Sequence, residues 1–458
     1  MRSEFSSIEY PPGPHSILPN KLFRQFMRDP LKTLTNIANT YGNICHFKFG
    51  RQTIYLVNDP NYIEDILIRN YKNFIKTRGL QVAKRLLGEG LVTSEGEYHD
   101  RQRRIIQPTF HPNRIKGYGD VITSHAIRMC ERWKEGTTLD IHKEMMHVTL
   151  EIISTAVLGS DIKPEEDEVG VALQTCLEYF NRLQMPFGEL IEKIPILPIN
   201  KGYQSAKRKL DSVVRNMIKE HRDKESVYHQ QDLLYTLLQA QDTEAGIGRM
   251  TDLQLKDEVM TIFLAGHETT SNALTWTFYL LSQNPTVDDR LYAELCSVLG
   301  DKNTKRVPTV EDIPNLVYTE KVFRESMRLY PPAWTIGRKC VKDYKVGKYT
   351  IPAGSIILMS QYVMHHDSRY FSDPDVFYPD RWTKEMKSNL PRFSYFPFGG
   401  GIRGCVGEPF AWMEGILLLA TISREWRLHH DVSHKVGLKP LITLRPKYGM
   451  RMRLERRK

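Results

Sequence analysis

The chain has 458 residues, enough for one large domain or for two to three ordinary ones, and its 41% hydrophobic and 26% charged residues are typical of a globular protein. Its six cysteines are scattered without a Cys-x-x-Cys pair, which argues against a disulfide framework or a zinc site and favours a reducing compartment. The net charge of +10 has no nucleic-acid recognition motif beside it. We therefore expect an acidic protein partner and no nucleic acid.

The N-terminus carries no targeting or membrane signal. Residues 1–10 contain no apolar stretch, so we expect no signal peptide, no transmembrane anchor and a cytoplasmic location. Four residues, Pro-Pro-Gly-Pro at 11–14, are stiff and extended, and we assign 1–14 as an extended leader. No repeat, low-complexity tract or linker interrupts residues 15–458, which we assign to one domain.

Apolar periodicity predicts a mainly α chain with a small β part. The predicted helices are 31–41, 101–106, 121–133, 143–158, 206–223, 231–239, 253–281, 288–299, 319–329 and 409–424. The predicted strands are 44–49, 53–57, 344–346, 349–351, 355–360, 441–444 and 450–454. The helix that spans 251–283 is unusually long, with Asp252 as its expected N-cap.

The middle of this long helix breaks a local rule. Ala265, Gly266, Glu268 and Thr269 lie in an otherwise apolar stretch, where a glycine costs about 1 kcal/mol relative to alanine. Such violations tend to fall at functional sites. The pair Ala265-Gly266 offers a flat surface for a macrocycle, and the next two polar residues can hold water or a proton. The alternative is a glycine kink, with the threonine bonded back to the preceding turn.

The segment 397–407 reads Pro-Phe-Gly-Gly-Gly-Ile-Arg-Gly-Cys-Val-Gly, and a helix-forming run follows it. Backbone N–H groups of such a loop and the N-terminus of the next helix favour a thiolate at Cys405. A thiolate is the form of cysteine that ligates iron. The glycines let a large flat cofactor approach the backbone. A buried structural thiol and a catalytic nucleophile remain open alternatives.

The spacing Phe-x-x-Gly-x-Arg-x-Cys-x-Gly closely resembles the heme-binding loop of the cytochrome P-450 family, and Ala-Gly-His-Glu-Thr resembles its oxygen-activation helix. The resemblance spans nearly the whole chain. It implies the cytochrome P-450 fold, a single triangular-prism-like domain. It also implies heme b (iron protoporphyrin IX), bound between the long central helix and the helix after Cys405.

The resemblance also assigns cofactor residues. Those implied to bind heme are His99, Arg103, Ala265, Gly266, Thr269, Arg338, Pro397, Phe398, Arg403, Cys405 and Gly407, with Cys405 as the iron ligand. His99 stands where the family usually has tryptophan, and Tyr98 is the alternative propionate donor. Phe398 is expected to pack near the sulfur.

A structural triad is implied as well. Glu325, Arg328 and Arg381 match the family's Glu–Arg–Arg triad, which locks the core beneath the heme. A buried charge trio is tolerated only if every member is paired. By itself, the spacing of the first two also fits a surface ion pair of little energetic value.

The resemblance implies a heme-thiolate monooxygenase that inserts one oxygen atom of O2 into a C–H or C=C bond. Thr269 and Glu268 are the implied catalytic residues, and the substrate is a hydrophobic small molecule of the fatty acid, terpenoid or steroid class. The implied pocket residues are Leu80, Leu87, Val92, Phe263, Leu264, Ala265, Ala333, Trp334 and Leu441. The apolar segment 180–198, with Leu183, Met185, Phe187, Ile194, Ile196 and Leu197, is interpreted as a mobile lid.

Electrons are expected from a separate protein, since the chain shows no flavin or iron–sulfur domain. Basic residues expected on the Cys405 side of the heme would steer an acidic ferredoxin or flavodoxin. They are Arg101, Arg103, Arg104, Lys384, Lys387 and Arg392. Two alternatives keep the heme: a peroxygenase or isomerase, and a non-catalytic heme-binding sensor.

Overall fold

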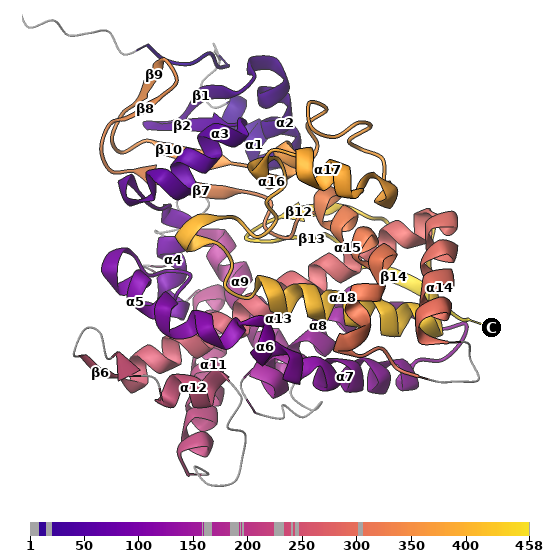
Figure 1. Ribbon diagram of the computed structural model, residues 1–458. Coiled ribbons are helices and arrows are strands. Elements are labelled where there is room, and N and C mark those ends of the chain that lie inside the picture. Colours follow the sequence, from indigo (N-terminus) through magenta and orange to yellow (C-terminus); the bar gives the residue numbers. More distant parts are fainter. Residues whose placement is uncertain are drawn as a thin grey trace, which may run out of the picture. The chain divides into compact units, whose positions relative to one another are not determined.

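In the computed structural model of the chain, the described residues are 9–14, 21–157, 159, 167–183, 192, 194, 197–223, 233–239, 241–242, 247–300 and 306–457. The fold consists of two units, each assembled from separated stretches of sequence (Figure 1). Unit 1 comprises residues 1–78, 328–376 and 383–405, and unit 2 comprises 79–327, 377–382 and 406–458.

Unit 1 is organised around a five-stranded sheet in the order β1-β2-β10-β7-β3. Its strands are β1 (Ile44–Phe49), β2 (Gln52–Val57), β3 (Phe74–Lys76), β7 (Ile336–Cys340) and β10 (Ile356–Met359). β1 and β2 form the predicted antiparallel hairpin, in which Gly50 adopts the positive φ of 60° that the tight turn requires. β10 pairs with β2 in parallel, so the sheet joins distant parts of the sequence. A separate hairpin is formed by β8 (Tyr344–Val346) and β9 (Tyr349–Ile351).

The helices of unit 1 are short. They are α1 (Lys21–Arg28), α2 (Pro30–Tyr41), α3 (Pro60–Glu64), α16 (Gln361–His365) and α17 (Lys384–Asn389), with single turns η1 (Asp65–Arg69), η2 (Tyr71–Asn73), η9 (Arg392–Ser394) and η10 (Gly401–Arg403). α2 begins where Asp29 accepts a hydrogen bond from the Lys32 N–H (3.0 Å). The proline-rich end of the expected leader packs on β1, since the His46 N–H donates to the Pro12 carbonyl (3.0 Å).

Unit 2 is mostly helical. Its helices are α4 (Arg78–Leu87), α5 (Gly96–Ile106), α6 (Pro112–Ile115), α7 (Gly119–Arg132), α8 (Ile141–Ile152), α9 (Asp167–Leu183), α11 (Pro198–Asp223), α12 (Leu233–Gln239), α13 (Asp252–Gln283), α14 (Pro285–Leu299), α15 (Val317–Leu329, ending across the unit boundary) and α18 (Glu408–Glu425). Shorter turns are η3 (Gln107–Phe110), η4 (Lys116–Tyr118), η5 (Ile153–Val157), η7 (Val310–Asn315) and η8 (Pro379–Arg381). Its strands are β4 (Thr138–Asp140), β5 (Gln241–Asp242), β6 (Ile247–Arg249), β11 (Trp426–His430), β12 (Leu438–Pro440), β13 (Leu444–Pro446) and β14 (Arg451–Arg456). They pair as β11-β14-β4, β12-β13 and β5-β6.

The helix α13 is the centre of unit 2, and it packs against α8, α18 and the β12–β13 hairpin (Figure 1). It is buried on nearly every side, which explains why its polar residues are not gathered into one solvent-facing stripe. Thr251 is its N-cap and forms a capping box with Gln254, so the expected cap at Asp252 is wrong by one residue.

The predicted fold class, mainly α with small sheets, is confirmed. The strand predicted at 441–444 is wrong: its first three residues form the turn between β12 and β13, closed by the Leu441 N–H to the Thr443 carbonyl (3.1 Å). Of the proposed lid, Met185, Phe187 and Ile196 lie outside the described residues, as do residues 1–8 of the expected leader. Within the described ranges, no helix combines the length and apolar character needed to cross a bilayer.

Candidate functional site

The Cys405 loop in unit 1 is closed by its own backbone. The Cys405 N–H donates to the Phe398 carbonyl (2.9 Å), and the Gly404 N–H donates to the Gly401 carbonyl (3.0 Å). Gly399 and Gly401 have φ values of 71° and 68°, a region that other residues adopt only with strain. The glycine pattern therefore determines the shape of the loop.

Two of the loop glycines are required by contacts within unit 1. A Cβ at Gly400 would lie 2.6 Å from the Phe393 ring, and one at Gly401 would overlap the Leu67 carbonyl. The sequence interpretation gave these glycines to a cofactor, whereas the structure shows that the packing of the loop already excludes side chains there.

Cys405 differs from the buried thiols of the chain. Burial raises the pKa of Cys45 and Cys176 to about 12 and that of Cys340 to about 11, so these thiols stay protonated. Cys405 is exposed, which argues against the alternative of a structural core thiol. An accessible thiol in a rigid loop is a donor that fits heme iron.

Two of the predicted propionate cations lie in unit 1. Arg338, on β7, is buried and donates to the Gly337 carbonyl (3.0 Å). Arg403 donates to the Phe74 carbonyl at the end of β3 (2.6 Å). Each guanidinium has five N–H donors and can bond to more than one acceptor.

The other predicted propionate donors lie on α5 in unit 2. His99 is buried, with its Nδ1 3.1 Å from the Asp100 carboxylate. The Tyr98 hydroxyl accepts from Gln102 Nε2 (2.8 Å), and Arg103 Nε donates to a glutamine side chain one turn on (3.2 Å). The choice between His99 and Tyr98 stays a prediction.

The middle of α13 has one open stripe. Ala265 is exposed and both Gly266 and Thr269 are partly exposed, while Leu264, His267, Glu268 and Thr270 on this helix are buried. The Thr269 hydroxyl donates back to the Ala265 carbonyl (2.8 Å), as the alternative interpretation expected, yet the helix continues without a break. The stripe leaves room for a flat group beside the helix. The residues present therefore fit a heme.

Gly266 also has a packing role, and its expected contact with heme stays a prediction. A Cβ at this position would lie 2.7 Å from Ile153 Cδ1, at the start of η5. The absent side chain thus permits close packing of α13 on η5, and Gly266 is itself partly exposed beside Ala265.

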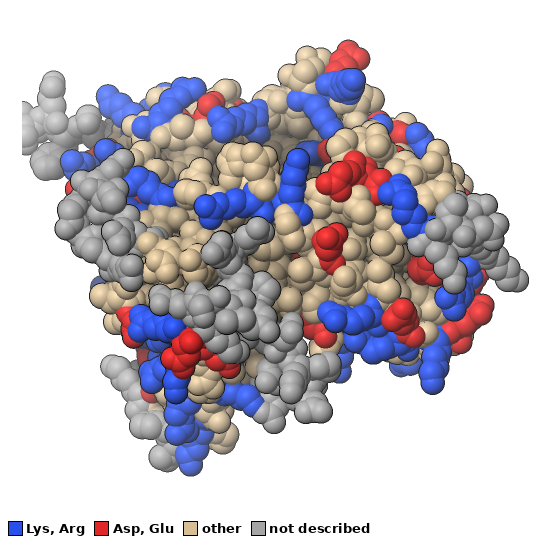
Figure 2. All heavy atoms as spheres, turned by 60° about the horizontal axis from the view of Figure 1, so that its bottom comes forward, with Lys and Arg blue, Asp and Glu red and all other residues tan. Residues whose placement is uncertain are grey.

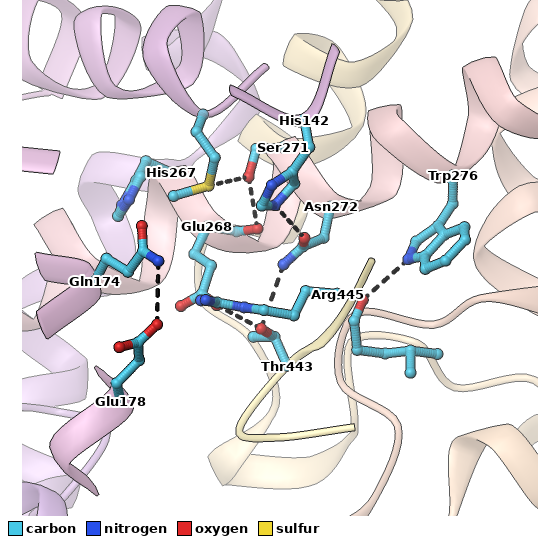
Figure 3. A network of polar contacts seen from close by, with 12 residues as sticks. His142, Gln174, Glu178, His267, Glu268, Ser271, Asn272, Trp276, Thr443 and Arg445 are labelled. Atoms are coloured by element: carbon cyan, nitrogen blue, oxygen red, sulfur yellow. Dashed lines mark hydrogen bonds and ion pairs between the residues drawn. The ribbon is translucent and has the colours of Figure 1, made fainter. Parts of the chain in front are cut away.

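Glu268 is part of a buried polar network (Figure 3). Its carboxylate forms an ion pair with Arg445 and accepts from the Thr443 hydroxyl (2.6 Å). Thr443 in turn accepts from Asn272 Nδ2 (3.3 Å), and His142 Nε2 lies 3.1 Å from Asn272 Oδ1. Burial, and then the charge of Arg445, lower the pKa of His142 to about 4, so His142 is neutral and donates. Along this series of hydrogen bonds, every donor points toward the Glu268 carboxylate.

This arrangement modifies the sequence interpretation of Glu268. The residue is 3% exposed, so its carboxylate is held by partners inside the protein rather than facing solvent. Sequence reasoning missed Thr443, Arg445, Asn272 and His142. The only available signal was an arginine directly after the predicted strand 441–444.

A second buried carboxyl group lies on α18. Glu414 is fully buried, and burial raises its pKa to about 8 against a smaller opposing contribution from the Thr270 hydroxyl. It is therefore mostly a neutral acid at pH 7, and its partner Thr270 lies two residues along α13 from Glu268. A glutamate inside an apolar helical run was the overlooked signal.

The structure brings together two members of the predicted triad in unit 2. Glu325 is fully buried and accepts from Arg381 Nε (2.8 Å) and the Tyr378 N–H (3.1 Å) through one oxygen. Its other oxygen accepts from Trp382 Nε1 (2.9 Å), a partner that the sequence did not suggest. The carboxylate is thus saturated with donors, as a buried charge requires.

Arg328, the third member, is fully buried and anchors unit 1. It donates to the carbonyls of His365 (2.8 Å), Pro374 (2.6 Å) and Val376 (3.1 Å). Its guanidinium also lies 5.2 Å from the centre of the Phe371 ring. The alternative of a surface ion pair is wrong, because both Arg328 and Glu325 are inaccessible to solvent.

The predicted pocket residues differ in exposure. Leu87, Phe263, Leu264 and Trp334 are buried, whereas Leu80, Val92, Ala333 and Leu441 are partly exposed. A half-exposed apolar side chain is available to a hydrophobic ligand, whereas a fully buried one contributes mainly to packing. Their contact with substrate stays a prediction.

Comparison with known proteins reveals extensive similarity. A family model described as cytochrome P450 matches residues 10–451. Cyclooctatin synthase from Streptomyces melanosporofaciens is 35% identical over 91% of this chain and 89% of the relative, and pentalenene oxygenase from Streptomyces avermitilis is 30% identical over 94% of each. Cyclooctat-9-en-7-ol 5-monooxygenase from Streptomyces melanosporofaciens is 35% identical over 88% of this chain and 85% of the relative. The crystal structure of the cytochrome P450DA heme domain matches with a TM-score of 0.87 and 25% identity, covering 98% of both chains.

Proposed function

Since the chain belongs to the cytochrome P450 family and is a heme b monooxygenase of a hydrophobic substrate, we propose that the substrate is a terpenoid. One oxygen atom of O2 enters its C–H or C=C bond. The names of the relatives support the substrate class, because they refer to terpenoid oxygenation. The observation that carries the reaction is the open stripe of α13, at which Thr269 is partly exposed directly after the buried Glu268.

Bound heme b supplies the iron at which O2 is reduced and from which one oxygen atom is transferred to substrate. We propose that the Cys405 thiolate holds this iron and that Arg338, Arg403, Arg103 and His99 hold the propionates. The rigid backbone of the Cys405 loop supports this role, because it fixes the sulfur before any cofactor binds.

Thr269 and Glu268 are proposed to manage protons. The Thr269 hydroxyl can accept a hydrogen bond while it donates to the Ala265 carbonyl, so it can hold a proton donor at the open stripe. Glu268 must exchange its contacts with Arg445 and Thr443 to hand on a proton. The ion pair therefore holds the carboxylate in place between turnovers.

An acidic ferredoxin or flavodoxin is the proposed electron donor. Arg104 on α5 in unit 2 is exposed, and so are Lys384, Lys387 and Arg392 in unit 1. On the face drawn in Figure 2, Lys and Arg side chains are spread more widely than Asp and Glu, in keeping with the net charge of +10. Reduction rates that do not depend on ionic strength would contradict this proposal.

We also propose that residues 15–458 act as one catalytic domain, that 1–14 precede it as a leader, and that the protein is cytoplasmic. The buried thiols support the location, because reduced cysteines persist in a reducing compartment.

The substrate class is tested with a panel of terpenes, fatty acids and steroids, scored by the high-spin shift of the heme and then by product formation with a surrogate ferredoxin and reductase. We expect terpenes to give the strongest shift and an oxygenated product. A shift confined to fatty acids or steroids would contradict the substrate class. Product with peroxide alone would favour a peroxygenase, and binding without any product would favour a sensor.

A further inference from the structure

The segment 88–94, between α4 and α5, folds into a compact loop. The Thr93 hydroxyl donates to the carbonyls of Gly88 (2.7 Å) and Gly90 (3.1 Å). The N–H groups of Thr93 and Ser94 both donate to the Gly90 carbonyl (2.9 Å each). These internal hydrogen bonds therefore give the segment a defined shape within unit 2.

Two adjacent carboxyl groups of α13 attach this loop to the helix. Asp257 Oδ2 accepts from the Glu89 N–H (2.9 Å), and Glu258 Oε2 accepts from the Leu91 N–H (2.9 Å). Asp257 is 5% exposed and Glu258 is 0% exposed. Burial raises the pKa of Asp257, which shows that this placement is costly for a carboxylate. Two buried acids thus serve as acceptors for backbone amides of the loop.

Glycines make this attachment possible. Gly88 has a φ of +55°, and a Cβ there would overlap the Asp257 carboxyl group. A Cβ at Gly90 would overlap the Thr261 hydroxyl and lie 2.6 Å from the Asp257 carbonyl. The loop therefore fits the shape of the helix at Asp257, Glu258 and Thr261, three positions of α13 that all precede the open stripe.

We infer that Asp257 and Glu258 are specificity-determining positioning residues, whose carboxyl groups fix the segment 88–94 and thereby the placement of Val92 against substrate. The inference rests on the proposed function and on the sequence prediction that Val92 lines the substrate pocket. Val92 is one residue from the Leu91 amide, so a tether on this amide restricts the side chain that follows it. Neither acid touches the reacting atoms in this account.

The test uses the heme-loaded enzyme and a matched set of variants. Glu258→Leu removes the acceptor for Leu91, whereas Glu258→Gln keeps an oxygen acceptor and should rescue. Glu89→Gln is the control, because only the backbone N–H of Glu89 bonds to Asp257 and its side chain pairs with Lys84 at the surface. Asp257→Ala removes the other tether and replaces Glu258→Leu if that variant does not fold.

Two measurements follow, neither of which needs a terpenoid. Hydrogen exchange of residues 88–94 should be roughly tenfold faster in Glu258→Leu than in the wild type, Glu258→Gln or Glu89→Gln. The Kd of 4-phenylimidazole, whose ring needs the shape of the pocket, should change by about fivefold or more, while that of imidazole stays within about twofold.

Unchanged exchange, or equal weakening of both imidazoles, would overturn the inference. So would a Glu89→Gln control that behaves like Glu258→Leu. Failure of the terpene panel with these results intact would refute only the substrate class.

Discussion

Removing Arg445 is the sharpest perturbation of the Glu268 network. Arg445→Met keeps an apolar side chain of similar length and deletes the charge that pairs with the buried Glu268 carboxylate. Glu268 then retains the Thr443 hydroxyl as a donor but no cation. A buried carboxylate without its counter-ion is much less stable than a paired one, so the variant should be destabilised.

The expected size follows from burial and chain length. Both side chains are under a tenth exposed, so breaking their pair should cost about 3–5 kcal/mol. An unfolding entropy of about 2.1 cal/mol/K per residue gives roughly 1 kcal/mol/K for a chain of 458 residues. The melting temperature of the heme-loaded protein should therefore fall by about 3–5 °C.

The assay is thermal unfolding of four proteins at neutral pH: the wild type, Arg445→Met, Glu268→Leu and the double variant. The double variant should melt closer to the wild type than Arg445→Met does, because no unpaired charge remains buried. Arg445→Lys, which keeps the charge, should lose less than Arg445→Met. Additive losses in the double variant, or an Arg445→Met protein that melts within about 1 °C of the wild type, would refute the reasoning.

Three further results are expected. Burial and then the charge of Arg445 lower the pKa of His142 to about 4, so as pH falls the unfolded state binds the proton before the folded state does. The free energy of unfolding should therefore fall by ~3 kcal/mol as pH falls from 6.5 to 4. His142→Gln should lose this dependence when melting is measured as a function of pH. Burial raises the pKa of Glu414 to about 8, so the free energy of unfolding should fall by roughly 4 kcal/mol as pH rises from 4.5 to 8. Glu414→Gln should remove this loss, and a variant that keeps it would contradict the raised pKa. Glu325→Gln should cost about 3 kcal/mol or more and release heme, measured by the heme-to-protein absorbance ratio. The partly exposed pair of Arg324 with Glu320 is the control, because Glu320→Gln should cost about 0.5 kcal/mol or less.

Much of the fold follows from local patterns. The hairpin of β1 and β2 follows from alternation around Gly50, and the start of α2 follows from Asp29 before a proline. The strand predicted at 441–444 failed for a physical reason. The turn at 441–443 is held by tertiary contacts, among them the Asn272 Nδ2 bond to the Thr443 hydroxyl (3.3 Å), and no local propensity encodes them.

The site divides in the same way. The Cys405 loop is local, so its spacing was readable from the sequence, and its fold depends on nearby glycines. The partners of Glu268 are not local, since Arg445 lies 177 positions away on another element. No periodicity links two such residues, and only the folded chain shows that the carboxylate is paired rather than open to solvent.

The most direct test of the central claim is the carbon-monoxide difference spectrum of the reduced protein. We predict the red-shifted Soret band of thiolate-ligated heme in the wild type and in Cys296→Ser, a control at a partly buried cysteine on α14. Cys405→Ser should lose this band while the protein stays folded by circular dichroism. A wild-type protein without the band, or a Cys405→Ser protein that keeps it, would contradict the account.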